Sequence, residues 1–431
     1  MAQAHLVPSQ AAVRPGRRAR DGGVGFADPL AWLARCALLH SLEGLEDGQL
    51  TLRLPEGETR RFGPPDAALK ATLVVERDSF FRALALHGPL WIGDSYVDGD
   101  WQTDDLPGLI ELGQLNYDRL MRGAWYARLT RVGSLVSYWL GRGAENTRAG
   151  SRRNIHAHYD LGNDLFALFL DESMTYSSAI FSQPDEDLQK AQENKYRALA
   201  EKAGIGAGDR VLEIGCGWGG FAMFAARRYG CRVTAITISA EQHDLATRRA
   251  REAGLDHLVE VRLCDYRDVE RETGGGFTKI VSIEMLEAVG QRYWETYFRA
   301  CDRLLAPGGR IAIQTIAVPD EHFDDHVRTA HWVQKRVFPG GLLPSLGALR
   351  ETLERSTRLA IAEIDEIGRH YARTLAHWRR AFLARLDAVR ALGYDERFCR
   401  LWEFYLAGSE AGFRTGRLLD YQLTLTRPEV G

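Results

Sequence analysis

The sequence predicts an α/β fold for the larger, C-terminal part of the chain and a smaller α+β region before it. From residue 151 onward, short apolar runs alternate with longer amphipathic segments, which is the pattern of strands joined by crossover helices. A buried strand that leads into a glycine-rich turn and a helix, at residues 210–228, supports the same prediction. Because crossover helices connect parallel strands, we expect one parallel sheet with helices on its faces.

Each element follows from its local pattern. In the first region, 29–39 predicts a helix, the runs 50–54 and 73–76 predict strands, and the glycines and aspartates of 93–101 predict a loop. In the second region we expect strands at 210–214, 232–237, 258–263, 279–283 and 310–316, and helices at 185–203, 219–228, 240–253 and 294–304. The domain organisation predicted from these patterns is a flexible basic tail at 1–27, an accessory domain at 28–140, a linker at 141–150 and the main domain at 151–431.

The composition narrows the class of protein. The 431 residues include 55 basic and 58 acidic side chains, and the resulting net charge of −3 argues against a dedicated nucleic-acid binder. The cysteines form no CxxC pair, which fits a reducing compartment and neither a zinc ribbon nor a disulfide scaffold. No apolar run approaches the roughly 18 to 20 residues of a membrane span. We therefore expect any membrane contact to be peripheral.

The most informative stretch is the glycine-rich turn within 211–220. Glycines permit tight backbone geometry and close approach of a ligand, and the turn follows a strand at the edge where open α/β sheets bind ligands. The third glycine of a dinucleotide fingerprint is indistinct here, because Gly219 and Gly220 both follow Gly217. Glu213 precedes the first glycine by two residues, as in S-adenosylmethionine enzymes, where a carboxylate attracts the ammonium group of the methionine moiety. The turn favours S-adenosylmethionine over a nicotinamide or flavin, and a purely structural turn is the remaining alternative.

Side chains after the second and third strands fit the rest of a nucleoside. Thr237 and Gln242 offer a hydroxyl and an amide where an acidic residue commonly binds ribose. Ser239 and Gln242 also predict a capped helix start, which is compatible with that role. Tyr266 follows the third strand, where an adenine usually lies, and offers an aromatic face.

Eight stretches, in order along the chain, resemble the cyclopropane-fatty-acyl-phospholipid synthases and the related mycolic acid and fatty-acid methyltransferases. They are 158–166, 174–179, 211–220, 237–242, 265–268, 282–290, 338–345 and 410–414. The resemblance implies a Rossmann-like class I methyltransferase domain, with S-adenosylmethionine as its cofactor. The motif and the resemblance together predict these cofactor-binding residues: Tyr176, Ser177, Glu213, Gly215, Gly217, Thr237, Ile238, Gln242, Tyr266 and Arg267.

The resemblance also implies the substrate, which is the cis double bond of an unsaturated acyl chain on a membrane phospholipid. An isolated alkene is a weak nucleophile, so the electrophilic methyl group must be held close and in line with it. Methyl transfer leaves a carbocation on the chain, so the pocket must exclude water, and aromatic faces can stabilise the cation. Closure of a cyclopropane ring then needs a base that removes a proton from the added methyl group.

In the resembling family that base is a bound bicarbonate ion, and its pocket matches this chain in part. Glu287 and Tyr371 match the family, and Ile283 supplies the matching backbone. Ser178 stands where the family has Cys, and Gln314 where it has His, although both side chains still donate hydrogen bonds. A further cysteine of the family, sometimes called catalytic, is Ser409 here. These six residues are the predicted catalytic set.

Ser178 in place of Cys and Gln314 in place of His leave the product of the reaction open. If the methyl proton is removed inefficiently, the cation can lose a neighbouring proton and give a methyl-branched olefin. A fatty-acid C-methyltransferase is therefore the main alternative to a cyclopropane synthase, and a lipid-binding protein that kept the fold is a third hypothesis. The expected setting is cytoplasmic, peripheral to the inner face of the cell membrane, with acyl-chain capture by the 28–140 domain, no nucleic-acid partner and a possible homodimer.

Overall fold

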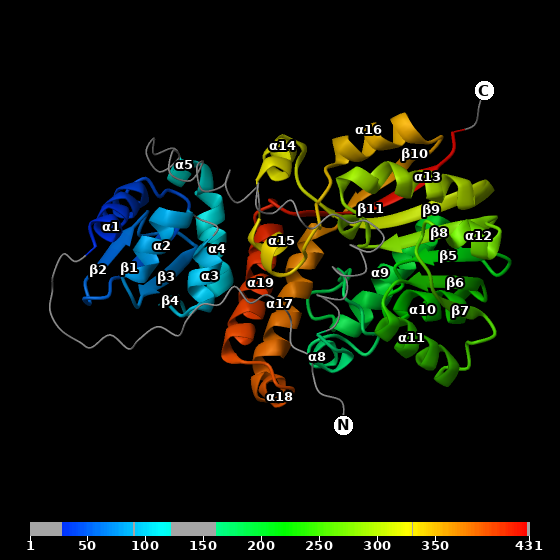
Figure 1. The fold of residues 1–431 in the computed structure, drawn as a ribbon, viewed down its shortest axis with the longest axis horizontal. Helices are drawn as coiled ribbons and strands as arrows, with labels where there is room; N and C mark the ends of the chain where they lie inside the picture. The colour runs from blue at the N-terminus through cyan, green and yellow to red at the C-terminus, as the bar shows by residue number, and fades with distance from the viewer. Residues whose placement is uncertain (1–27, 89–90, 122–160, 330, 429–431) are drawn as a thin grey trace.

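Two sheets organise the chain in the computed structural model, which describes residues 28–88, 91–121, 161–329 and 331–428 (Figure 1). The predicted tail at 1–27 and linker at 141–150 lie outside the described residues. The N-terminal sheet has the order β2-β1-β3-β4, with β1 parallel to β3 and antiparallel to β2. Its strands are β1 (Gln49–Arg53), β2 (Thr59–Phe62), β3 (Lys70–Val75) and β4 (Trp101–Gln102), and its helices are α1 (Pro29–Leu42), α2 (Ser79–His87), α3 (Trp91–Val97), α4 (Leu106–Leu115) and α5 (Tyr117–Met121).

Helix α3 corrects the prediction of a loop over 93–101. The stretch begins as a helix because its side chains have partners elsewhere in the chain. Asp94 accepts hydrogen bonds from Trp332 Nε1 (3.0 Å) and Arg336 Nε (2.9 Å). A Cβ at Gly93 would lie 2.6 Å from Trp332 Nε1, so glycine permits this close approach. Tertiary packing overrides the local preference of glycine and aspartate for a loop.

The second sheet has seven strands in the order β10-β11-β9-β8-β5-β6-β7. The strands are β5 (Arg210–Ile214), β6 (Arg232–Thr237), β7 (Val259–Leu263), β8 (Phe277–Ile283), β9 (Leu305–Ala317), β10 (Ala360–Glu366) and β11 (Leu419–Thr426). The first five pair in parallel and confirm the predicted strands and the α/β class. Strand β11 pairs antiparallel with both β9 and β10, and the sequence did not predict these last two strands.

Helices cover both faces of this sheet. The helices and 3₁₀ turns of this part are α8 (Asn163–Ala167), α9 (Leu188–Ala203), α10 (Gly220–Tyr229), α11 (Ala240–Glu252), α12 (Val269–Thr273), η2 (Leu286–Ala288), η3 (Gln291–Tyr293), α13 (Trp294–Leu304), α14 (Asp320–Arg328), α15 (Trp332–Arg336), α16 (Leu346–Ser356), α17 (Gly368–Ala384), α18 (Leu386–Ala391) and α19 (Glu396–Arg414). Successive strand residues face opposite sides. Val211 packs in the core with α9 and α10, and Leu212 packs in the core with α13 and α16.

Helix α19 joins the two sheets, because it lies between the N-terminal domain and the helices beside the larger sheet (Figure 1). Tyr96 Oη donates to Glu403 Oε2 at 2.8 Å, and Arg400 Nε donates to the Tyr96 carbonyl at 2.7 Å. Ala407 is fully buried and belongs to the core of the N-terminal domain. On its other side, α19 packs with α8 and α17 in an aromatic cluster of Phe166, Phe169, Trp218, Tyr371, Trp378, Phe382, Trp402, Tyr405 and Phe413.

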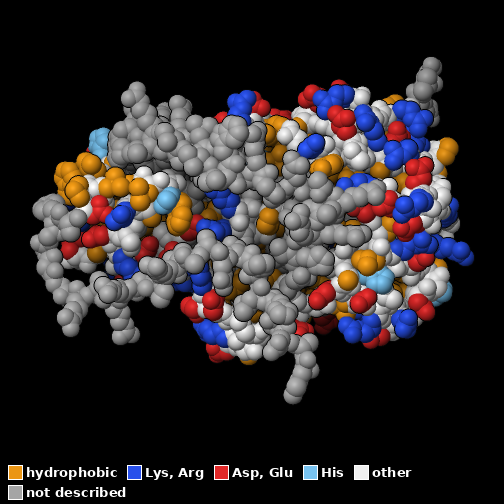
Figure 2. Space-filling model, in the orientation of Figure 1, with side chains coloured by type: hydrophobic (Ala, Val, Ile, Leu, Met, Phe, Trp, Pro, Cys, Tyr) orange, Lys and Arg blue, Asp and Glu red, His pale blue; other side chains and the backbone are white. Residues whose placement is uncertain are grey.

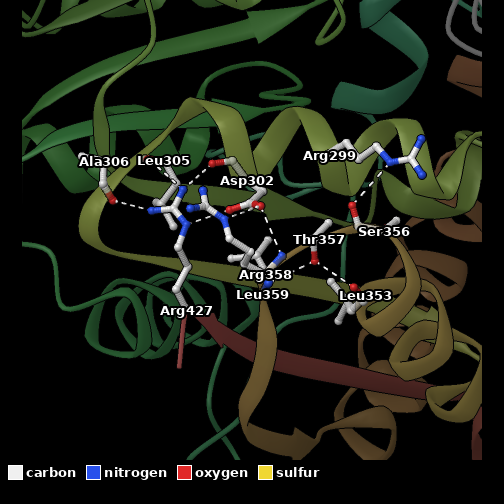
Figure 3. Close-up of polar contacts among 10 residues, drawn as sticks. All are labelled: Arg299, Asp302, Leu305, Ala306, Leu353, Ser356, Thr357, Arg358, Leu359 and Arg427. Carbon is white, nitrogen blue, oxygen red and sulfur yellow. Dashed lines mark hydrogen bonds and ion pairs between the residues drawn. The ribbon is translucent and has the colours of Figure 1, made fainter. Parts of the chain in front are cut away.

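A polar clasp fastens the end of β11 to α13 (Figure 3). Arg427 Nε donates to Asp302 Oδ1 at 2.7 Å, and its terminal nitrogens donate to the carbonyls of Leu305 and Ala306 at 2.9 and 3.0 Å. The Arg358 N–H also donates to Asp302, at 3.2 Å. Burial by itself raises the pKa of Asp302, but these hydrogen bonds outweigh it and hold the pKa below its usual value.

Candidate active site

A cavity opens at the carboxyl ends of β5, β6 and β8, where an α/β sheet is expected to bind its ligand. All ten residues predicted to bind the cofactor line this one cavity. They come from four stretches: the loop before α9 (Tyr176, Ser177), the first strand and its turn (Glu213, Gly215, Gly217), the second strand and the helix after it (Thr237, Ile238, Gln242), and the loop after the third strand (Tyr266, Arg267).

The glycine-rich turn has the backbone geometry that the sequence predicted. Gly215 and Gly217 have φ values of 81° and 51°, a region that favours glycine. A Cβ at Gly215 would lie 2.7 Å from Met285 Cγ, whereas a Cβ at Gly217 would meet no atom within 4 Å. Packing therefore requires a glycine at the first position, and the second leaves backbone open to the cavity.

Glu213 is a buried carboxyl group at the end of β5 that lines the cavity. Burial raises its pKa to about 8, and the opposing charge of Lys195 offsets only part of this effect. Its Oε2 atom is buried and has no hydrogen-bond partner among the described residues. A cationic group entering the cavity would supply the missing partner and favour the ionised carboxylate.

The residues after the second and third strands are held in place by short polar contacts. Thr237 Oγ1 donates to Gln242 Oε1 at 2.8 Å, and Ser239 Oγ accepts from the Gln242 N–H at 3.3 Å, which confirms the predicted helix cap. Arg267 Nε donates to Asp265 Oδ1 at 2.8 Å. Tyr266 packs edge-on against Tyr297, with ring centroids 5.4 Å apart.

Glu284, a half-buried carboxylate on the cavity wall, accepts hydrogen bonds from three of the predicted catalytic residues. Its Oε1 accepts from the Ser178 N–H and from Gln314 Nε2, both at 2.7 Å, and its Oε2 accepts from Tyr371 Oη at 2.6 Å. The donors come from the loop before α9, from β9 and from the start of α17. Glu284 itself follows directly after β8 and has a φ of 48°, which is uncommon for a residue other than glycine.

Charged and acidic groups surround Glu284. Lys195 is fully buried on α9, donates to Ser177 Oγ at 2.6 Å, and has its pKa lowered by burial to about 8. Burial raises the pKa of Glu284, while the Tyr371 hydrogen bond and the Lys195 charge act in the opposite direction. Asp420 on β11 accepts from Gln314 Nε2 at 3.1 Å, and burial and the neighbouring acids raise its pKa well above the usual range.

The other three predicted catalytic residues are Ile283, Glu287 and Ser409. Ile283 lines the cavity at the end of β8. The Glu287 carboxylate accepts from the Ile316 N–H and from Thr315 Oγ1 (3.0 Å), and burial, with the nearby Glu284 charge, raises its pKa to about 8. Ser409 lies on α19 and is not among the residues that line the described cavity.

Sequence reasoning singled out neither Glu284, Lys195 nor Asp420. Glu284 stands inside the 282–290 stretch that supports the resemblance, but its left-handed backbone and its distant partners cannot be read from that stretch. Lys195 lies in an ordinary polar helix, and Asp420 in a strand that was not predicted. The one signal in the sequence was Lys195 itself, because a lysine is rarely found on the face of a helix that packs into the core.

Aromatic rings cover the cavity where it approaches Glu284. Tyr176 lines the cavity, stacks on Trp378 with centroids 5.2 Å apart, and makes a 2.8 Å hydrogen bond with Tyr405. Tyr371 stacks on Phe413 at 4.5 Å. Aromatic rings therefore enclose this end of the cavity, beside the polar and charged groups that contact the carboxylate. No group of His, Cys, Asp and Glu suited to a metal ion occurs among the described residues, and none of their helices is long and apolar enough to cross a membrane.

Comparison with known proteins identifies the family. Residues 146–423 match the family model of mycolic acid cyclopropane synthetase. The chain is 40% identical to a tuberculostearic acid methyltransferase of Mycobacterium tuberculosis, over 93% of both chains. It is 34% identical to the cyclopropane-fatty-acyl-phospholipid synthase of Escherichia coli, over 83% of this chain and 88% of that one.

Solved structures agree with this result. The structure of a mycolic acid cyclopropane synthase complexed with SAH and CTAB matches with a TM-score of 0.58 and 29% identity, over 64% of this chain and 97% of that chain. The seven-stranded sheet is that of the class I methyltransferases, as the resemblance implied. The chain belongs to the mycolic acid cyclopropane synthetase family of S-adenosylmethionine-dependent lipid methyltransferases.

Proposed function

We propose that the enzyme transfers a methyl group from S-adenosylmethionine to the cis double bond of an unsaturated acyl chain on a membrane phospholipid, and that loss of a proton then closes a cyclopropane ring. The observation that carries this proposal is one cavity whose wall holds both the predicted cofactor residues and the Glu284 carboxylate. Ordinary methylation of oxygen or nitrogen needs no aromatic enclosure of this kind, whereas an alkyl cation does.

The residues on the cavity wall fit the cofactor. Glu213, with an unpartnered buried oxygen, would pair with the ammonium group, and the open backbone at Gly217 would lie against the ligand. Thr237 and Gln242 would accept and donate to the ribose hydroxyls, and Tyr266 would cover the adenine. When bound, S-adenosylmethionine supplies an electrophilic methyl group.

The chain's own residues would then protect and guide the cationic acyl chain. The ring of Tyr176, which lines the cavity and is backed by Trp378, would offer negative electrostatic potential to a nearby cation. Their packing within the aromatic cluster excludes water, which would otherwise capture the cation. A basic group must finally accept the proton that the cation loses.

The sequence-based candidate for that base is bicarbonate, and the residues do not fit it. The side chains of Gln314 and Tyr371 were expected to donate hydrogen bonds to the ion, but both donate to the Glu284 carboxylate. The Ser178 hydroxyl was expected to do the same, but it donates to the Ala179 carbonyl at 3.1 Å, and the Ser178 backbone N–H donates to Glu284. A second anion at these donors would have to displace that carboxylate or lie against its negative charge. Glu287 supports β9 through Ile316 and Thr315, and a role for Ser409 rests on the resemblance alone.

A second candidate product is a methyl-branched olefin. It is favoured by the 40% identity to a tuberculostearic acid methyltransferase along nearly the whole chain. Both products follow from the same cation and differ only in which proton is lost. The ring forms when the proton leaves the added methyl group, and the olefin forms when it leaves a neighbouring chain carbon.

One experiment tests the proposal and separates the products. Purified enzyme is incubated with unsaturated phospholipid vesicles and isotopically labelled S-adenosylmethionine, and the fatty acid methyl esters are analysed by mass spectrometry before and after mild hydrogenation. We expect label in the acyl chain, in a product that resists hydrogenation. A labelled product that takes up hydrogen would show that the enzyme makes the olefin and not the ring. Absence of label from the lipid would refute both candidate products.

We also propose that the N-terminal domain associates with lipid, as its predicted accessory role implies. Trp32 and Leu33 on α1 and Leu86 on α2 are large apolar side chains that are 48, 52 and 49% exposed. Hydrophobic side chains gather over this domain in Figure 2. Grouped apolar side chains of this size on a surface are typical of contacts with membranes or proteins. Homodimer formation and a place at the inner face of the membrane remain predictions.

A further inference from the structure

The Glu284 carboxylate has the surroundings of a bound oxyanion. Its two oxygens accept three hydrogen bonds, from a backbone N–H, an amide and a phenol, and the three donors belong to three separate elements. A carboxylate has about four acceptor positions. Three are filled by the described residues, so about one remains for a proton.

The backbone holds this side chain at the cavity by a strained conformation. Glu284 has a φ of 48°, and its N–H donates to the Gln314 carbonyl at 2.8 Å, which extends the pairing of β8 with β9 beyond the end of the strand. Left-handed conformations of residues other than glycine cost energy and persist where surrounding structure enforces them, commonly at functional sites. The conformation places a carboxylate on the wall of the methyl-donor cavity.

The groups around Glu284 favour a negative charge on this residue rather than on its acidic neighbours. Lys195 from α9 is the nearby cation, and Tyr371 from α17 donates to the carboxylate. Glu287 from η2 has its pKa raised to about 8, and burial and the neighbouring acids raise the pKa of Asp420 from β11 well above its usual range. Burial raises the pKa of Glu284 as well, but its three hydrogen-bond donors and the Lys195 charge act in the opposite direction and stabilise the carboxylate form.

We propose that Glu284 is the catalytic base of this enzyme and takes the place of a bound bicarbonate ion. The inference rests on the proposed function and adds to it the group that accepts the proton. In the first step the alkene π electrons form a bond to the methyl carbon, and the carbon–sulfur electron pair leaves with sulfur. In the second step a Glu284 oxygen takes a proton either from the added methyl group or from a chain carbon adjacent to the cation. In the first case the carbon–hydrogen electron pair forms the last ring bond, from the methyl carbon to the cationic carbon. In the second case it forms the new double bond of the olefin.

Turnover in bicarbonate-depleted buffer tests this assignment. We expect wild-type turnover to be unchanged when bicarbonate is removed or restored. Glu284→Ala should lower turnover about 100-fold or more, the usual scale of losing a general base. Added bicarbonate should recover about tenfold of that loss, because the ion can enter the vacated space and meet the same donors. Glu284→Gln should be equally impaired and not rescued, because the amide fills the space without being basic.

A binding measurement gives a readout that does not depend on turnover. Titration with ¹³C-labelled bicarbonate, followed by NMR, should show saturable binding to Glu284→Ala and none to the wild type. Glu201→Gln, an exposed change on α9, is the matched control and should behave as the wild type in both measurements. Affinity for S-adenosylhomocysteine, measured for each variant, shows that the cavity is folded.

The outcomes separate the two proposals. Wild-type turnover that depends on bicarbonate, saturable binding of the ion to the wild type, or full turnover of Glu284→Ala without bicarbonate would each overturn the assignment of Glu284. Failure of the wild type to methylate any unsaturated lipid would refute the proposed function instead. In that case the labelled-bicarbonate titration still decides whether Glu284 fills the ion site.

Discussion

Glu213 illustrates how burial prepares a single residue for a ligand. A carboxyl group with a pKa of about 8 is mostly protonated at neutral pH, and an incoming ammonium group stabilises its ionised form. Binding of a cationic ligand should therefore release a proton from the enzyme. Because the pKa of Glu213 is raised in the fold, this residue adds to the free energy of unfolding of the unliganded protein below pH 4.5. That contribution is lost as the pH rises towards 8.

We predict that affinity for S-adenosylmethionine strengthens as the pH rises from 6 to about 8, the pKa of Glu213. Glu213→Gln should weaken binding by roughly 10- to 100-fold at pH 8, as expected for loss of a charge-assisted hydrogen bond of about 1.5 to 3 kcal/mol. It should also remove most of the pH dependence. Isothermal titration calorimetry in buffers of different ionisation enthalpy measures both the affinity and the protons released. Glu260→Gln, exposed on β7, is the control, and an unchanged pH profile in Glu213→Gln would contradict the prediction.

At the residue scale, the proposed cofactor site was predictable from the sequence and the proposed base was not. The cofactor residues sit in short motifs, where glycine geometry and strand position follow from neighbours in the sequence. Glu284 depends on a left-handed backbone and on donors more than 80 residues away along the chain, such as Tyr371. Such a site exists only after β8, β9 and α17 have packed together.

At the scale of elements, sequence patterns predicted the strands with buried apolar side chains. Strands β5 to β8 were predicted with boundaries close to those observed, because apolar runs alternate with helices there, whereas β9 (Leu305–Ala317) begins five residues before its predicted start at 310. Strand β10 was missed because it is an edge strand whose side chains are largely exposed, so no apolar pattern marks it. Strand β11 was missed although Leu419, Leu423 and Leu425 mark one face, since a strand after a long helical region was not expected.

The clasp between β11 and α13 should contribute measurably to stability. Arg427→Ala removes charge-assisted hydrogen bonds to Asp302 and should lower the free energy of unfolding by about 2 kcal/mol. Because the pKa of Asp302 is lowered in the fold, this contribution is present above pH 3.8 and is lost as the pH falls through the lowered value. Urea unfolding at pH 7 and at low pH measures the effect.

The control for the clasp is Arg303→Ala. Arg303 lies on α13, as Asp302 does, and the substitution removes an exposed ion pair with Glu270 on α12. Exposed pairs contribute little, so we expect a change below about 1 kcal/mol. The clasp would have no special role if the two variants lost equal stability at pH 7.

At the scale of the whole molecule, the exposed apolar side chains of α1 predict how the enzyme reaches its substrate. The double variant Trp32→Ser/Leu33→Ser should weaken binding to anionic phospholipid vesicles by roughly tenfold or more, since burial of one such side chain is worth about 1.5 to 3 kcal/mol. Turnover of detergent-dispersed substrate should stay unchanged. Vesicle co-sedimentation and the labelling assay measure the two quantities. Leu392→Ser, exposed beyond α18, is the control, and undiminished vesicle binding by the double variant would exclude α1 as the contact.

The position of α19 has a consequence for the order of events during synthesis on the ribosome. Ala407 completes the core of the N-terminal domain, and Glu403 and Arg400 hold its Tyr96, yet these residues are translated almost 300 positions after that domain. The early-made domain therefore emerges with one apolar side uncovered and waits for the last helix of the chain. We expect this interval to be the stage of biogenesis at which the nascent protein most needs chaperones.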